Sequence, residues 1–183
     1  MLIRDAQREV RTVFFGGFAG QLVSGIIWLL SAALATWLEP VIGIWVLVAG
    51  GFFTFPLTQL VLRLMGRRPT LSAENRLNGL AMQVAFTLPL NLPLVAAATF
   101  YRLDWFYPAF MIALGTHYLP FVFLYGMPHF AALAALLIGG GLALALYIPG
   151  PFALGGWLTG LVLVMFAFAG ALLIRREGRL AAG

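Results

Sequence analysis

FYPAFMIALGTHYLPFVFLYGMPHFAALAALLIGGGLALALYIPGPFALGGWLTGLVLVMFAFAGALLI, residues 106–174, contains no Asp, Glu, Lys or Arg. An uncharged apolar run of about 18 residues is long enough to cross a membrane as a helix, and this block can hold three. Glycine and proline clusters divide it at GMPH and YIPGP. We therefore predict membrane-spanning helices at about 106–126, 129–148 and 153–174.

The rest of the chain repeats this pattern. Three more runs without charge, residues 12–38, 40–62 and 77–101, predict spans at about 13–38, 41–65 and 77–100. Of the 183 residues, 62% are hydrophobic and only 9% are charged, too few to cover a core of this size in water. We predict an all-α, polytopic transmembrane bundle of six helices, with residues 1–183 forming one transmembrane domain.

The arginines predict the orientation of this bundle. If the amino terminus is inside, every arginine except Arg102 falls on the cytoplasmic side, as the positive-inside rule requires. The same orientation puts a set of aromatic rings at the outer interface: Trp37, Trp45, Tyr101, Trp105, Tyr107, Tyr147 and Trp157. We expect both termini in the cytoplasm of a bacterium and the protein in its inner membrane, with four arginines anchoring it at lipid headgroups: Arg67, Arg68, Arg175 and Arg176.

Several functional classes are disfavoured by composition. The chain has no cysteine and no lysine, which excludes disulfides, thiolate metal sites and Schiff-base chemistry. The predicted spans carry no carboxylate for an ion-coupled pump, and no catalytic constellation is evident. The basic residues flank the spans, so topology explains them better than nucleic acid does. We expect no enzyme and no nucleic-acid partner.

Small residues predict how the helices pack. Stripes at four-residue spacing let two helices approach closely in lipid. Three spans carry them: Gly16, Gly20 and Ser24; Ala131, Ala135, Gly139 and Ala143; Gly156 and Gly160. We expect these faces to pack within the chain, and a homodimer interface is the alternative.

Prolines inside the second, third and fourth spans predict kinks there, at Pro56, Pro89, Pro93 and Pro120. A broken backbone ladder in hydrocarbon needs neighbouring groups to satisfy it. An internal cavity is therefore expected among these three helices. In the loop at 66–76, Ser72 is a candidate cap for the third span.

His117 is the main candidate for a functional residue. At about 1.5 Å per residue it lies about 16 Å below the outer start of the fourth span, near the midplane. The third span should be its antiparallel neighbour, with polar residues at i, i+4 and i+8. We predict a neutral polar site built from His117, Tyr118, Asn91, Thr87 and Gln83, with Gln21 of the first span lining the same cavity.

Other roles for these residues stay open. A buried histidine can simply join helices by hydrogen bonds, and axial ligation of haem or a chlorophyll-type pigment is a further alternative for His117. Gln21 can equally bond a neighbouring helix. His129, at the inner start of the fifth span, is expected at the membrane interface. Its spacing from His117 does not suit a metal site, and no metal or cofactor is expected.

FFGGFAGQLVSGIIWL (14–29) and GTHYLPF (115–121) resemble an uncharacterised family of small bacterial multipass membrane proteins, of the domain-of-unknown-function kind. The resemblance covers nearly the whole chain and implies no activity. Two hypotheses of function remain. One is a transporter or channel for a small neutral or weakly polar solute, acting as a dimer. The other is a non-catalytic subunit or assembly factor of a larger membrane complex.

Overall fold

The computed structural model describes residues 1–148 and 150–180. These residues form helices and no strand, as predicted. In chain order the helices and 3₁₀ turns are α1 (Ile3–Val13), η1 (Phe15–Gly17), α2 (Phe18–Trp37), α3 (Pro40–Leu64), α4 (Leu77–Tyr101), η2 (Leu103–Trp105), α5 (Phe106–Tyr125), α6 (His129–Leu146) and α7 (Leu154–Leu180).

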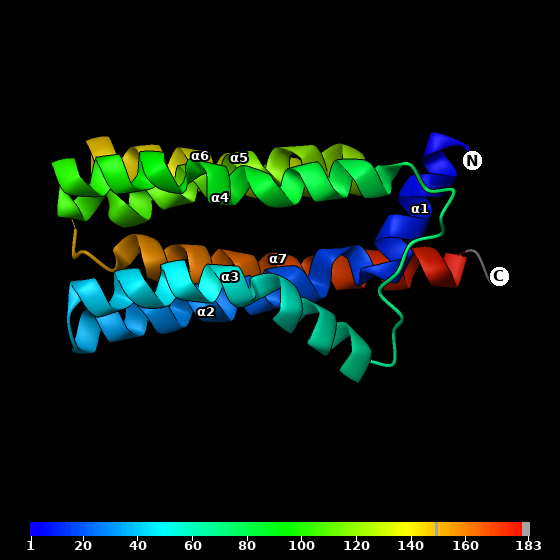
Figure 1. Ribbon diagram of the computed structural model, residues 1–183, viewed down its shortest axis with the longest axis horizontal. Coiled ribbons are helices and arrows are strands. Elements are labelled where there is room, and N and C mark those ends of the chain that lie inside the picture. Colours follow the sequence, from blue (N-terminus) through cyan, green and yellow to red (C-terminus); the bar gives the residue numbers. More distant parts are fainter. Residues whose placement is uncertain (149, 181–183) are drawn as a thin grey trace.

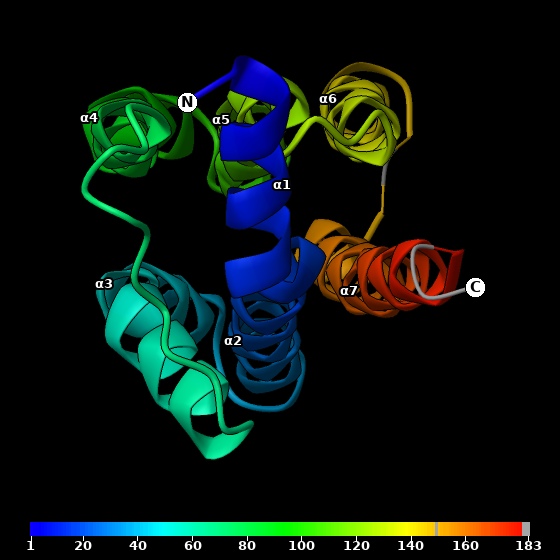
Figure 2. The same ribbon diagram turned by 90° about the vertical axis from the view of Figure 1, so that its right-hand side faces the viewer.

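The six long helices are arranged in two layers (Figure 1). One layer holds α4, α5 and α6, and the other holds α3, α2 and α7. Packing within each layer is extensive, with α5 between its two neighbours in one and α2 between its two in the other. The layers meet chiefly where α7 contacts α5 and α6. Seen from the end in Figure 2, α1 crosses from one layer to the other.

Within the part of the chain that the structure describes, six helices are long and apolar enough to span a membrane, which confirms the predicted fold class. Five begin within one residue of the predicted start. The last helix continues to Leu180 rather than stopping at residue 174, because its charged end can remain helical in water. Helices α3, α4 and α5 each contain internal proline, and the kinks expected there stay a prediction.

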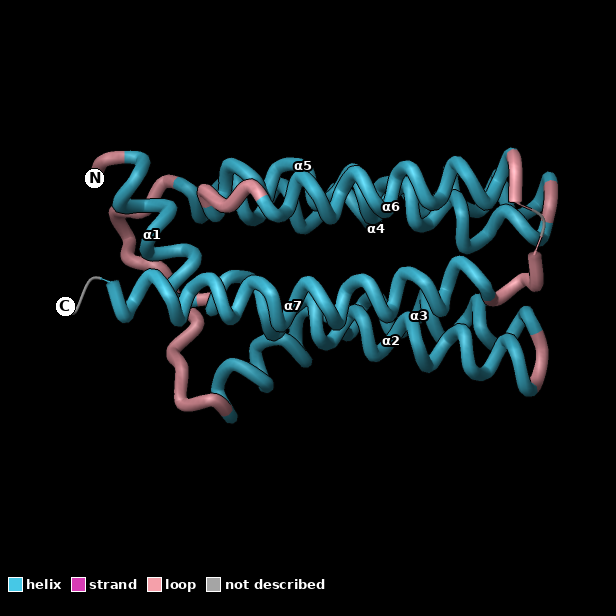
Figure 3. The backbone as a smooth tube through the Cα atoms, turned by 180° about the vertical axis from the view of Figure 1, so that it is seen from behind, coloured by secondary structure: helices cyan, strands magenta, loops and turns pink. Residues whose placement is uncertain are grey.

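The predicted first span, 13–38, corresponds to the apolar stretch Phe15–Trp37, but it is not one continuous helix. Val13 ends α1, and η1 separates it from α2. Three consecutive residues, Phe15, Gly16 and Gly17, have φ of 51°, 63° and 81°, in the left-handed region that breaks a helix. The chain therefore turns, and α1 lies across the bundle end instead of extending α2 (Figure 3).

Helix α1 is strongly amphipathic and is tied to both layers. Its apolar face buries Ala6 and Val10. Gln7 donates to the carbonyl of Phe123 on α5 at 2.6 Å, and Arg11 pairs with Glu177 on α7 at 2.9 Å. Helix α1 is thus a packed crossbar at the end of the bundle.

Small residues mediate the packing of α2 on α7. A Cβ on Gly16 would lie 2.9 Å from the carbonyl oxygen of Gly170, and one on Gly160 would lie 2.6 Å from Leu29. The stripe on α6 behaves differently, since Ala131, Ala135 and Gly139 are exposed. The expectation that this stripe packs within the chain is therefore wrong.

At the end opposite α1, Tyr107 is buried and hydrogen bonded instead of lying at the lipid interface. Ser31 donates to the carbonyl of Gly43 at 2.8 Å. Its single hydroxyl proton is thereby used, so Tyr107 must donate in the 2.6 Å contact with Ser31. This network joins α2, α3 and α5.

Candidate functional site: a cavity between the helix layers

A cavity of about 300 Å³ lies between the two layers. Helices α2, α3, α4 and α5 supply most of its wall, and Val10, Phe14 and Phe130 close it near the α1 end. None of the lining side chains is charged, and many are aromatic. A concave apolar site with a few polar groups is the usual form of a small-molecule site.

Gln21 is the most unusual residue of this wall. Gly17, Gln21, Ser24 and Trp28 follow one another at spacings of three or four residues and therefore lie on one face of the helix. This face lines the cavity. The side chain of Gln21 is 2% exposed, and neither amide atom has a hydrogen-bond partner among the described residues. A buried amide without partners costs about 1–3 kcal/mol, and a ligand or water in the cavity would offset this cost.

His117 is held by Thr87 across the α4–α5 contact. Thr87 Oγ1 lies 2.8 Å from His117 Nδ1 and also 2.8 Å from the carbonyl oxygen of Val84, to which it donates. A hydroxyl has one proton and a carbonyl has none, so Nδ1 must be the donor to Thr87. The neutral ring therefore keeps its acceptor lone pair on Nε2, and His117 lines the cavity.

Two hydroxyl groups of α3 also face the cavity. Thr58 donates to the carbonyl of Thr54 at 2.7 Å, and Thr54 donates to that of Gly50 at 3.4 Å. Both protons are used within the helix, which leaves only acceptor lone pairs for a bound molecule.

The predicted site residues are brought together in part. His117, Tyr118 and Gln21 line the cavity. Thr87 and Asn91 lie behind the imidazole, where Asn91 donates to the carbonyl of Thr87 at 2.8 Å. Gln83 is exposed and does not line the cavity, so its predicted place in the site is not supported.

Sequence reasoning did not find the contribution of α3, namely Thr54 and Thr58. Both are polar residues within a predicted span, and they lie four residues apart on one face of the helix. That spacing was a usable signal, and the prolines had already indicated a cavity among α3, α4 and α5.

His129 differs from the prediction in its surroundings. Its ring lies against Phe130 and Phe166, between α6 and α7, and both nitrogens are buried without a partner among the described residues. It does not line the cavity. Among the residues that the structure describes, no group of three or more ligating side chains could hold a metal ion.

Polar contacts of α1 attach it to the loop at 66–76. The carboxylate of Glu9 accepts from the backbone N–H of Ser72 at 2.6 Å and from Asn75 Nδ2 at 2.9 Å. These bonds, the Ser72 N–H first, lower the pKa of Glu9. Ser72 therefore binds Glu9 rather than capping α4, and Asn75 accepts from the N–H of Leu77 instead.

Arg67 has a partner within the chain at this end. Its Nη1 donates to the carbonyl of Thr12 at 2.6 Å, and its guanidinium lies 4.3 Å from the centre of the Phe15 ring. Arg175 also faces Phe15, at 5.7 Å. Contact of Arg67, Arg68, Arg175 and Arg176 with lipid headgroups stays a prediction.

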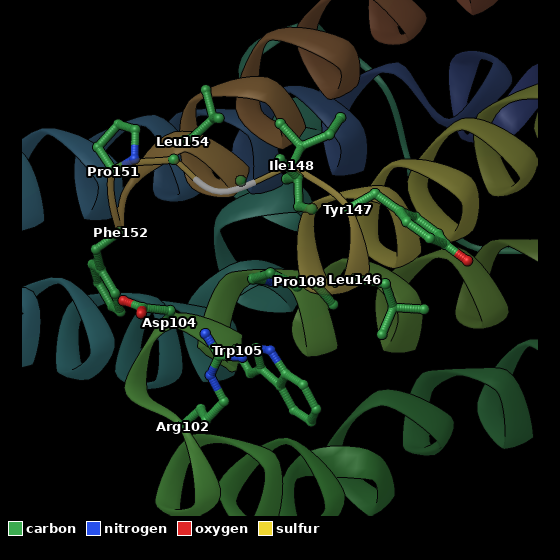
Figure 4. A pocket seen from close by; sticks show the side chains of 14 residues that line it. Arg102, Asp104, Trp105, Pro108, Leu146, Tyr147, Ile148, Pro151, Phe152 and Leu154 are labelled. Atoms are coloured by element: carbon green, nitrogen blue, oxygen red, sulfur yellow. The ribbon is translucent and has the colours of Figure 1, made fainter.

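A second cavity, of about 290 Å³, lies at the opposite end of the bundle (Figure 4). Arg102, Asp104 and Trp105 line one side, and residues 144–148 and 150–152 line the other. The guanidinium of Arg102 lies 5.5 Å from the Trp105 ring. This cavity contains none of the predicted site residues.

Comparison with known proteins places the chain in a family. The model of a family described as "Family of unknown function (DUF7010)" matches residues 3–176. The chain belongs to this family. The match includes α1 as well as the six apolar helices, and it confirms the resemblance seen in the sequence. No curated protein matches the chain, and no solved structure does.

Proposed function

We propose that this integral membrane protein is a non-catalytic transporter or channel for a small, neutral or weakly polar solute, which binds between the helix layers at His117 and Gln21. The observation that carries the proposal is the buried amide of Gln21, which faces a cavity and has no hydrogen-bond partner among residues 1–148 and 150–180. A dry scaffold would gain stability from an apolar residue at this position.

The electrostatics of the cavity support a neutral solute. No charged side chain lines it, so a bound ion would lose its hydration without a compensating charge. His117 and Gln21 come from opposite layers, and a solute held between them would contact both halves of the bundle. Relative movement of the two layers would then alter access to the site.

The arginine distribution supports a definite orientation in a bacterial inner membrane. The amino-terminal helix and the last turns of α7 lie at one end of the bundle in Figure 1. Arg67 and Arg175 both face Phe15 at this end, while Arg102 lies at the other. We assign the α1 end to the cytoplasm on the positive-inside rule.

The test uses purified protein and a panel of small neutral solutes. A solute that binds only the folded protein raises its free energy of unfolding by about 2.7 kcal/mol when the free solute concentration is 100 times the Kd. We expect at least one such solute, and we expect His117→Leu and Gln21→Leu to abolish the thermal shift. Thr116→Val and Gln83→Leu are matched controls on exposed positions and should keep it. Stabilisation that persists in both cavity variants would contradict the proposal.

A second candidate function has one observation in its favour. The small-residue stripe of α6 faces outward, and a Cβ on Gly139 would meet no atom within 4 Å. Such a face suits docking of a second copy or of another membrane subunit. Gly139→Leu should then abolish a dimer or a copurifying partner and leave solute-dependent stabilisation unchanged.

A further inference from the structure

The cavity has a recognisable mouth. Most residues of its wall are buried or half-buried, and only four are exposed. These four are Gly51 and Phe55 on α3, and Ala85 and Pro89 on α4. A residue that both lines a cavity and is exposed marks the place where the cavity reaches the surface. The mouth therefore lies between α3 and α4, which stand on the same side of the molecule in Figure 2.

This mouth opens at mid-depth in the bundle. Gly51 is about 16 Å from the start of α3, and Pro89 is about 18 Å from the start of α4, at 1.5 Å per residue. The hydrocarbon core of a bilayer is about 30 Å thick, so both residues face its centre. The side chains around the mouth are apolar, and Phe55 is 68% exposed. A molecule using this mouth must come from the lipid rather than from water.

The polarity of the cavity wall restricts the ligand further. The groups whose protons are already committed can only accept: Nε2 of His117 and the hydroxyl oxygens of Thr54 and Thr58. The amide of Gln21 and the hydroxyl groups of Ser24, Tyr118 and Tyr125, which also line the cavity, can accept and donate. Aromatic rings surround these groups, including Trp28, Phe110 and Phe121. A flat ring that carries a hydroxyl group would satisfy both the acceptors and the aromatic walls.

We propose that the cavity binds a neutral, lipid-dissolved molecule with a hydroxyl group on a ring, which enters between α3 and α4 and donates a hydrogen bond to Nε2 of His117. The inference rests on the proposed function and names the ligand class and the route for that site. It requires no charge in the ligand and no aqueous opening.

The first test measures donor selectivity. Trp28 lines the cavity, so heavy-atom quenching of a variant that keeps only this tryptophan reports occupancy. The protein is reconstituted in vesicles of phosphatidylethanolamine and phosphatidylglycerol and titrated with 4-bromophenol or its methyl ether, 4-bromoanisole. At equal concentration in the membrane, we expect the phenol to quench with about tenfold higher affinity, the value of one hydrogen bond. His117→Leu should remove the difference, and Thr116→Val should preserve it.

The outcomes separate this inference from the proposed function. Equal quenching by phenol and ether, or a preference that survives in His117→Leu, would overturn the donor assignment. Absence of quenching by both would overturn the ligand class. In either case, solute-dependent stabilisation that requires Gln21 and His117 would leave the proposed function standing, and its absence would remove that function too.

The second test closes the mouth. The chain has no cysteine, so Phe55→Cys with Ala85→Cys introduces one pair for bismaleimide reagents of graded length. Cross-linking within one chain should slow the onset of quenching at least tenfold, whereas each single variant treated with a monofunctional maleimide should retain the original rate. An unchanged rate after cross-linking would overturn the route. Cross-links between two chains would show that a second copy covers this face, which also overturns entry from lipid.

Discussion

At the scale of single residues, a substitution of Gln21 should change stability and solute binding in opposite directions. Gln21→Leu replaces an unpartnered amide by an apolar side chain of similar size, so the ligand-free protein should gain about 1–3 kcal/mol in its free energy of unfolding. Thermal or denaturant unfolding in detergent measures this change. Gln83→Leu, on the exposed face of α4, should leave stability within about 0.5 kcal/mol. A loss of stability in Gln21→Leu would mean that the amide has partners in the protein.

A second residue-scale prediction concerns the buried hydroxyl of Tyr107. Tyr107→Phe removes the donor to Ser31 and leaves that oxygen without its bond, so it should cost about 1 kcal/mol. Tyr101→Phe is the control, because Tyr101 is 76% exposed and should change stability little. Equal unfolding midpoints for the two variants would argue against the network that joins α2, α3 and α5.

The pairing of His117 with Thr87 could be predicted because α4 and α5 are joined by a short connection and their mid-depth residues must meet. The exposure of Gln83 could not be predicted. Gln83, Thr87 and Asn91 form one row at i, i+4 and i+8, but such a row winds around the helix, and Gln83 is exposed while Thr87 meets His117. Tyr107 was misplaced for a related reason: a tyrosine near a helix end suits the lipid interface and a buried hydrogen bond equally well.

At the scale of elements, the break between α1 and α2 depends on glycine. Gly16 has φ of 63°, and a Cβ there would lie 2.9 Å from the carbonyl oxygen of Gly170 on α7. Gly16→Ala should therefore cost about 1–3 kcal/mol through strain and loss of close packing. Gly79→Ala is the control, since a Cβ on Gly79 meets nothing within 4 Å. Unfolding in detergent distinguishes the two, and an unaffected Gly16→Ala would contradict the described turn.

The attachment of α1 to the loop at 66–76 should depend on pH. The pKa of Glu9 is lowered from its usual value of 4.5, chiefly by the Ser72 N–H, so the bonded carboxylate stabilises the fold fully above pH 4.5. That contribution is lost as pH falls through the lower pKa of the folded protein. The protection of the Ser72 amide against hydrogen exchange, relative to an unfolded chain at the same pH, should fall over this range. Glu9→Gln should lower this protection already at neutral pH, whereas Glu74→Gln, on an exposed residue of the same loop, should not. Protection that does not change with pH would exclude this attachment.

The long helices were predictable because each uncharged run has the length of a membrane span. The crossbar α1 was not, although two signals existed: a glycine pair at 16–17, and charges that leave one apolar face on residues 3–13. Helix propensity continues through this region, and only the left-handed backbone at Phe15, Gly16 and Gly17 interrupts it. A short interruption of that kind depends on the packing of Gly16 against α7, which local sequence does not contain.

At the scale of the whole molecule, the division into two layers could not be predicted from sequence. Six apolar helices can be arranged in many ways, and small-residue stripes do not specify their partners, as the outward stripe of α6 shows. The cavity arises from this arrangement, because the layers pack tightly within themselves and touch each other at few places. The prolines indicated which three helices would surround a cavity but missed the role of α2.

Orientation is a prediction at this scale. Arg68→Cys and Gly178→Cys should react with a membrane-impermeant maleimide only from the cytoplasmic side, and Leu103→Cys only from the outer side, because the positive-inside rule predicts that the α1 end is in the cytoplasm. Intact spheroplasts and inverted vesicles give the two accessible faces. Opposite accessibility of positions 68 and 178 would contradict the six-span topology itself.

The most direct measurement of the central claim is an experimental structure of the protein in lipid nanodiscs, at a resolution that shows side chains and bound molecules. The account predicts density for a small molecule between the layers, within hydrogen-bond distance of Nε2 of His117 and of the Gln21 amide, and its loss in Gln21→Leu. Closely packed side chains in place of the cavity, with Gln21 bonded to a neighbouring helix, would contradict it.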